Sequence, residues 1–198
     1  MEELDLLKKD WKKNNANFPE LSEKEIYGML HKKSSSIVKW ILIISIIEFT
    51  LWGGISLLHS LYGNTEIKPP LFIVILDYLN YGVLVFFITL FYVNYKNIST
   101  EKPVKDLMLN ILKVRKIVNY YVAYNILIIL FSSICGIIMY ESVNYPAFPD
   151  GYRILVIAIG VFLILLMVGI IYLIYKVIYG RLSKKLLKNY IELEKIKL

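Results

Sequence analysis

The chain has 198 residues, 57% of them hydrophobic and 20% charged, with a formal net charge of +7. Four apolar runs and their connections use nearly all of this length, which excludes a separate soluble catalytic domain. The positive charge lies beside the apolar runs, where it attracts anionic lipid headgroups. We therefore expect no direct binding of nucleic acid.

Each apolar run is long enough to cross a bilayer, because about 20 apolar residues span a hydrocarbon core of about 30 Å. The runs cover residues 37–58, 71–95, 118–140 and 154–175. Of the 23 Lys and Arg residues, 21 flank one side of these runs, and only Lys68 and Arg153 fall on the other. Cytoplasmic loops retain positive charge. The sequence thus predicts a multi-pass protein of the bacterial inner (cytoplasmic) membrane with both termini cytoplasmic.

The cytoplasmic segment before the first run, residues 1–36, shows two helical patterns separated by asparagines and Pro19. Leucines and a tryptophan share one face of the first pattern, with lysines beside them. Such an amphipathic helix suits a membrane surface or a groove on a partner. The predicted docking residues are Leu4, Leu7, Trp11, Lys8 and Lys12.

The second pattern opens with Ser22 and Glu25, which have the spacing of a capping box. We expect one helix from about Ser22 through the first span. The outer connection, residues 59–70, contains Gly63-Asn64 and two prolines, which favour a short turn. The second span then returns to the cytoplasm.

After an inner turn, Pro103 is placed to begin a third helix that projects into the cytoplasm by about four turns before it enters the membrane. A short outer loop is predicted over residues 141–153. The fourth helix is expected to continue beyond its span as a C-terminal amphipathic helix, residues 180–198. Gly180 weakens this continuation by about 1 kcal/mol, so a bend is expected to be tolerated there.

The predicted fold class is all-α: a polytopic membrane protein with four transmembrane helices in an antiparallel bundle and cytoplasmic helical extensions. Three segments follow from this prediction. They are a cytoplasmic N-terminal segment (1–36), the four-helix transmembrane domain (37–179) and the C-terminal helix (180–198).

Four polar residues interrupt the apolar runs and form a predicted intramembrane polar cluster: Glu48, Asp77, Asn80 and Asn125. Counted from the centre of its own run, Glu48 lies near the midplane. A carboxylate there is costly and functional by default. Two interpretations stay open. Glu48 is protonated and holds helices together through a hydrogen bond to Asn80 or Asn125, or it handles a proton or a ligand.

Eight tyrosines cluster at the predicted cytoplasmic ends of the spans, as an aromatic belt at the headgroup level would. They are Tyr92, Tyr95, Tyr120, Tyr121, Tyr124, Tyr172, Tyr175 and Tyr179. In the third run, Ser132 and Gly136 have the spacing that lets helices approach closely. The single cysteine, Cys135, permits no intrachain disulfide and is interpreted as a small buried residue.

Motifs for catalysis are missing from the sequence. His31 and His59, the only histidines, lie near opposite membrane surfaces, so they do not share a metal. Neither GxxxxGK[ST] nor GxGxxG occurs. We expect no cofactor, no metal and no enzymatic activity.

The N-terminal block resembles a group of small, uncharacterised multi-pass membrane proteins of flavobacteria. The resemblance rests on residues 4–13, 22–27 and 32–40 and covers roughly the first third of the chain. Some members of that group carry a carotene-oxygenase name, but such oxygenases use a four-histidine iron site that two histidines cannot supply. The resemblance also implies an association with extracytoplasmic-function sigma factors, and hence an anti-sigma-like regulator.

The expected function is a non-enzymatic regulatory or interaction role through the cytoplasmic helices, anti-sigma-like at its most specific. Its expected partners are the lipid bilayer with its anionic cytoplasmic headgroups, a cytoplasmic regulatory protein and, as an alternative, further copies of the chain. The alternative function is a small transporter or proton-linked channel that uses the intramembrane carboxylates Glu48 and Asp77.

Overall fold

The computed structural model describes residues 22–63, 70–99, 103–144 and 150–196. Within these ranges the chain is all-helical. The helices are α2 (Glu23–Tyr62), α3 (Leu71–Ser99), α4 (Val104–Asn144) and α5 (Asp150–Ile196). Each contains a window that is long and apolar enough to cross a membrane, as the sequence predicts. The N-terminal pattern with Leu4, Leu7, Trp11, Lys8 and Lys12 lies outside the described residues.

The predicted capping box starts α2. The Ser22 hydroxyl accepts a hydrogen bond from the Glu25 backbone N–H (3.3 Å), and the Glu25 carboxylate accepts one from the Ser22 backbone N–H (2.8 Å). At the other end of α2, the Gly63 N–H donates to the His59 carbonyl (2.8 Å). The helix therefore runs without a break through the first apolar run, as predicted.

Prolines mark the starts of the next helices. Pro70 and Pro103 precede α3 and α4, and their carbonyls accept the first backbone hydrogen bonds of each helix. The extension of α4 ahead of the third run is confirmed, as is that of α5 beyond the fourth. Gly180 lies within α5 and does not end it. The helices reach further than expected into the predicted outer loop, because α4 ends at Asn144 and α5 begins at Asp150.

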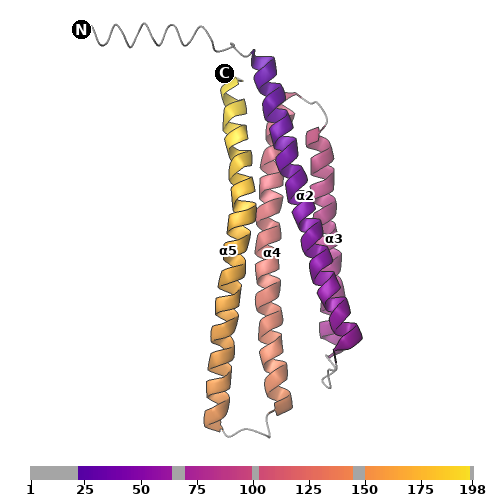
Figure 1. Cartoon of the computed structure of the whole chain (residues 1–198), viewed down its shortest axis with the longest axis vertical. Helices are drawn as coiled ribbons and strands as arrows, with labels where there is room; N and C mark the ends of the chain where they lie inside the picture. Colours follow the sequence, from indigo (N-terminus) through magenta and orange to yellow (C-terminus); the bar gives the residue numbers. More distant parts are fainter. Residues whose placement is uncertain (1–21, 64–69, 100–102, 145–149, 197–198) are drawn as a thin grey trace, which may run out of the picture.

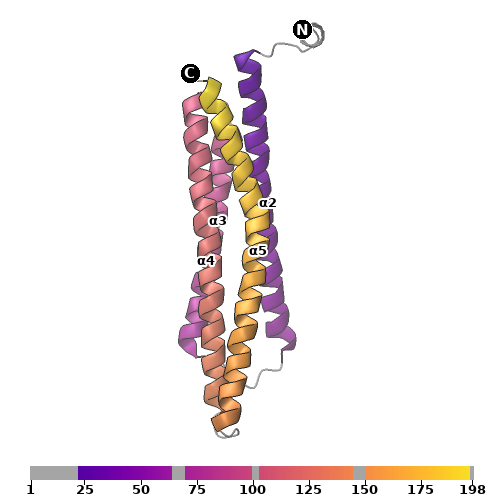
Figure 2. The same cartoon turned by 90° about the vertical axis from the view of Figure 1, so that its left-hand side faces the viewer.

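The four helices lie side by side along one long axis, and the beginning of α2 lies at the same end as the end of α5 (Figures 1 and 2). The main helix pairs are α2–α3, α3–α4, α4–α5 and α5–α2, and α2 also makes a smaller contact with α4. We call the half with the beginning of α2 the terminal half. It comprises residues 23–48, 84–99, 104–125 and 175–196, and the remainder of the helices is the distal half.

Burial is confined to the terminal half. Among the described residues, every buried hydrophobic side chain belongs to it. The fully buried members include Ile41, Phe91, Ile111, Leu186 and Leu193. The distal half exposes most of its leucines, isoleucines and phenylalanines. Toward its end, α2 and α3 diverge from α4 and α5 (Figure 1) and also from each other (Figure 2).

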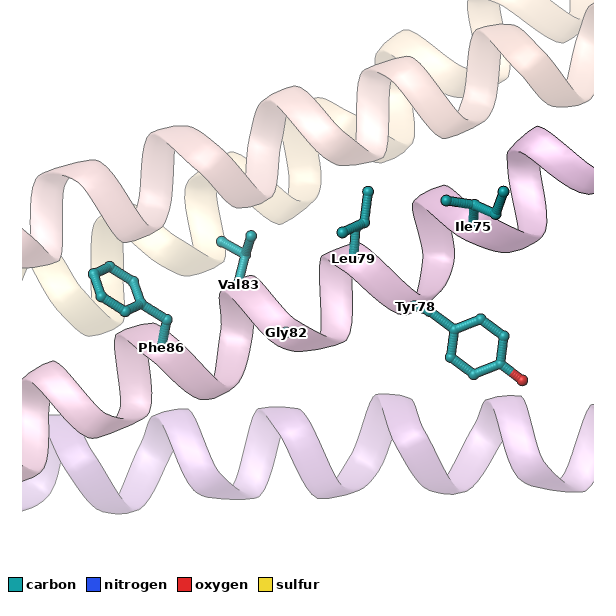
Figure 3. Close-up of a pocket in the computed structure, with 6 residues that line it drawn as sticks. All are labelled: Ile75, Tyr78, Leu79, Gly82, Val83 and Phe86. Carbon is teal, nitrogen blue, oxygen red and sulfur yellow. The ribbon is translucent and has the colours of Figure 1, made fainter.

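One exposed apolar hollow of the distal half lies on α3 and has a volume of about 480 Å³. Figure 3 shows its lining, with Leu79 and Phe86 on either side of Gly82, which contributes no side chain. Apolar surface of this extent on a monomer marks a contact with lipid or with another protein. The described side chains that line this hollow include no charged group, so it is not a candidate for a catalytic site.

Candidate functional site: a carboxylate held by tyrosines from two other helices

Glu48 is the centre of the main polar cluster inside the helices. The Tyr121 hydroxyl of α4 donates a hydrogen bond to Glu48 Oε2 at 2.6 Å. The Tyr179 hydroxyl of α5 donates to the same oxygen at 3.1 Å. A single carboxylate oxygen of α2 therefore accepts hydrogen bonds from both α4 and α5.

Aromatic rings enclose this cluster. Tyr121 makes edge-to-face contacts with Phe87 (5.4 Å between ring centroids), Phe91 (5.5 Å) and Tyr179 (5.5 Å). Tyr175 adds a further contact with Tyr179 at 5.7 Å. Such pairs contribute about 0.5–1.5 kcal/mol beyond the area that they bury. Within the described part of the chain, no lysine or arginine forms an ion pair with Glu48, so the two hydroxyls provide its compensation.

The structure gives the predicted partners of Glu48 other roles. Asn80 accepts a hydrogen bond from the Tyr124 hydroxyl at 2.8 Å, and the Asn125 amide donates to the Tyr121 carbonyl of its own helix at 2.8 Å. The expectation that Glu48 pairs with Asn80 or Asn125 is wrong. Tyrosines take that place because a tyrosine side chain is long enough to reach across the interior from a neighbouring helix.

Asp77 is separate from the Glu48 cluster. It is exposed and lines a hollow of about 230 Å³ between α3 and α4, together with Ser132, Cys135 and Gly136. A Cβ atom added at Gly136 would meet nothing within 4 Å, so the small pair Ser132/Gly136 does not bring two helices into close contact. The two carboxylates of the predicted polar cluster therefore occupy different sites.

The aromatic-belt interpretation stays a prediction for the exposed tyrosines among the eight and is wrong for the buried ones. Tyr92, Tyr120 and Tyr172 are exposed, as a belt requires. Tyr121, Tyr175 and Tyr179 are 2%, 7% and 1% exposed and belong to the interior. Spacing alone does not separate the two groups, because the exposed Tyr172 and the buried Tyr179 both share a helix face with Tyr175.

Further interhelical hydrogen bonds continue from this cluster toward the chain termini. The Arg115 guanidinium of α4 donates to the Ser183 hydroxyl of α5 at 3.3 Å. The buried Asn189 amide of α5 donates to the Ser34 hydroxyl of α2 at 3.0 Å. These contacts fix the register of the helices, since a shift by one residue would separate every pair.

That register staggers the apolar runs. Glu48 is at the centre of run 37–58, whereas Tyr121 is near the beginning of run 118–140 and Tyr179 lies beyond the end of run 154–175. At 1.5 Å per residue, the centres of the third and fourth runs lie roughly 12 and 22 Å further toward the distal end than Glu48. Figure 2 shows the corresponding offset, because α4 and α5 extend further toward the distal end than α2 and α3 do. The depth of a residue counted from the centre of its own run therefore cannot be compared with a depth counted on another helix.

The chemistry of the cluster is that of a hydrogen-bonding node. It has one acidic group and several phenols, and it lacks a nucleophile beside a base. In the described ranges, no group of three or more His, Cys, Asp or Glu side chains is placed to hold a metal ion.

No curated protein and no solved structure matches the chain. A family model described as a domain of unknown function, DUF8845, matches residues 24–198. This match covers α3, α4 and α5 in full and α2 from its second residue, and with them every residue of the Glu48 cluster. The chain therefore belongs to the DUF8845 family.

Proposed function

We propose that this protein is an integral membrane protein of the bacterial inner membrane with a non-enzymatic regulatory or interaction role on the cytoplasmic side. The four helices cross the bilayer as an antiparallel bundle with both termini cytoplasmic. The end of the bundle that holds both termini is then the cytoplasmic end, which agrees with the 21-to-2 division of the cationic residues. The exposed apolar side chains of the distal half then face lipid.

The observation that carries this proposal is the tight packing of the helix ends beyond the apolar runs. Leu107 and Ile111 of α4 and Leu186 and Leu193 of α5 lie outside their runs, yet they are at most 1% exposed. Free tails would leave such side chains in water. The cytoplasmic ends are therefore a packed helical platform, which suits the binding of a protein better than a transport pathway does.

The Glu48 cluster gives the platform a link to the membrane. It joins α2, α4 and α5 at the level where the packed half meets the diverging half. A change in the separation of the helix pairs in the membrane would act on the platform through these hydrogen bonds. At its most specific, the partner is a sigma factor, as the resemblance of the N-terminal block implies.

The test is crosslinking in native membranes followed by purification of the tagged chain. A variant that lacks residues 2–15 serves as the matched control. We expect the full chain to recover a defined cytoplasmic protein and the shortened chain to insert normally but lose it. Recovery of a sigma factor supports the specific form. Recovery of only further copies of the chain, or of no other protein, contradicts the proposal, and equal amounts of partner with both chains would assign the binding to the packed helix ends alone.

A second candidate is a proton-linked transporter or channel, favoured by the interior carboxylate with two phenol partners. Its support is limited by Asp77, which is exposed and has no hydrogen bond to Glu48 among the described residues. Proton flux into liposomes separates the candidates. The transporter requires a proton flux with the parent chain that Glu48→Gln abolishes. The regulatory function requires no proton flux with either chain.

A further inference from the structure

A basic hollow lies between α2 and α5 in the terminal half, apart from the Glu48 cluster. Its volume is about 680 Å³. Its lining includes Lys32 and Lys33 from α2 and Lys185 and Lys188 from α5. Of the residues that the structure describes, no acidic side chain lines it. Among the four lysines, Lys188 alone is near a carboxylate of the described residues, that of the half-buried Glu192 one turn away at 3.8 Å. Four cations thus converge on one hollow with little compensation.

The hollow has an apolar side as well. Trp40 lines it and is 56% exposed, three residues into the first apolar run. Tryptophan is enriched where hydrocarbon meets the headgroups. With α2 inserted as proposed, the lysines lie at the headgroup level, and the tryptophan lies at the level of the glycerol and upper acyl groups.

Asn189 forms part of the wall and adds a second polar requirement. Its side chain is fully buried, and its amide nitrogen donates to Ser34. Its carbonyl oxygen has no hydrogen-bond partner among the described residues. A buried acceptor without a donor is costly. A ligand that carries hydroxyl groups as well as negative charge would match both features of the hollow.

We propose that this hollow binds the headgroup of an anionic glycerophospholipid with free headgroup hydroxyls, of the phosphatidylglycerol type, from the cytoplasmic leaflet. The lysines hold the phosphate, and Asn189 accepts from a hydroxyl. Basic hollows between membrane helices on the cytoplasmic side are suited to anionic headgroups. The proposal rests on the membrane insertion and orientation proposed above, and it adds a lipid that holds α2 against α5.

The experiment uses the full chain in a neutral detergent and measures its affinity for dioctanoyl phosphatidylglycerol. Two double variants, Lys32→Gln/Lys185→Gln in the hollow and Lys105→Gln/Lys113→Gln on the exposed surface of α4, remove equal charge. We expect the first to weaken binding about thirtyfold, since each lysine near an anionic surface contributes a factor of about five. The second should change it less than about twofold. Lys32→Arg/Lys185→Arg should retain binding.

Three comparisons decide the source and the specificity of the ligand. Dioctanoyl phosphatidylcholine and glycerol 3-phosphate should each bind far more weakly than phosphatidylglycerol. Equal binding of phosphatidylcholine, equal binding of glycerol 3-phosphate, or equal weakening by the two glutamine pairs each overturns the site. A chain that does not sediment with membranes would instead refute the proposed insertion. A membrane-bound chain without lipid preference refutes only the lipid site.

Discussion

Tyr179 and Glu48 are 131 positions apart in the sequence and are joined by a 3.1 Å hydrogen bond. Glu48 stands in the middle of an apolar run, and Tyr179 stands in a segment with lysines and an arginine. The hydrogen bond therefore places the interior of one apolar run level with the charged margin of another.

The first prediction concerns the two hydroxyls on Glu48. Tyr179→Phe and Tyr121→Phe should each destabilise the folded chain by about 0.5–2 kcal/mol, because each removes one interhelical hydrogen bond and leaves the ring packing in place. Tyr172→Phe, at an exposed position of α5, is the control and should have no effect. Unfolding in mixed detergent micelles measures the difference. Equal effects of Tyr179→Phe and Tyr172→Phe would contradict a stabilising role of the hydrogen bonds to Glu48.

The second prediction concerns the carboxylate itself. Glu48→Gln should preserve assembly, since the amide oxygen still accepts from the tyrosines. Glu48→Lys should disrupt it by more than about 3 kcal/mol, because it places a cation against two phenol donors without a counter-charge. Gel filtration and circular dichroism in detergent report the outcome. Normal assembly of the lysine variant would mean that Glu48 faces water.

The third prediction concerns the packed platform. Leu186→Ala should cost about 2–5 kcal/mol, because Leu186 is fully buried and its truncation leaves a cavity. Leu165→Ala on the same helix removes the same atoms from a side chain that is 60% exposed, and it should be nearly neutral. Thermal unfolding of the two variants is the measurement. Similar losses for both would show that the helix ends in the terminal half are not packed in solution.

The fourth prediction concerns orientation. In a Cys135→Ala background, a cysteine at Tyr62, which is 78% exposed at the distal end, should react with a membrane-impermeant thiol reagent added to intact cells. A cysteine at Lys195 should react only after the membrane is opened. The reverse pattern would invert the proposed topology and move the lysine hollow to the outer leaflet.

The fifth prediction concerns the start of α2. Hydrogen bonds from the backbone N–H and hydroxyl of Ser22 hold the pKa of Glu25 below its usual value. A lowered folded-state pKa means that the stabilisation is present above the ordinary glutamate pKa and is lost as the pH falls through the lowered one. The protection of the first-turn amides of α2 against hydrogen exchange, corrected for the intrinsic exchange rate at each pH, should fall over that acidic range. Glu25→Gln should remove this pH dependence.

The helices could be predicted closely from the sequence, because their signals are local. Apolar length indicates the spans, Ser22 and Glu25 mark the start of α2, and Pro103 marks that of α4. The Glu48 cluster was predicted only in part. Glu48 was identified from the cost of its charge, but its partners were not, because which residue faces it depends on the register between helices. No local pattern reports that register.

The tyrosines illustrate why the partners of Glu48 could not be predicted from the sequence. A tyrosine near the end of a span satisfies the same sequence rule whether its hydroxyl reaches headgroups or a carboxylate inside. Tyr120 and Tyr121 are neighbours, yet the first is exposed and the second buried. Only the arrangement of α2, α4 and α5 distinguishes them.

The stagger of the apolar runs has a consequence for the bilayer around the protein. With the helices inserted as proposed, a flat membrane of uniform thickness does not match α2 together with α4 and α5, because the hydrophobic centres of α4 and α5 lie roughly 12 and 22 Å from that of α2. Either the bilayer must deform around the helices or the helices must tilt, at a cost of fractions of a kcal/mol for each ångström of mismatch. Membrane thickness would thereby act as a mechanical load on the hydrogen bonds of Glu48.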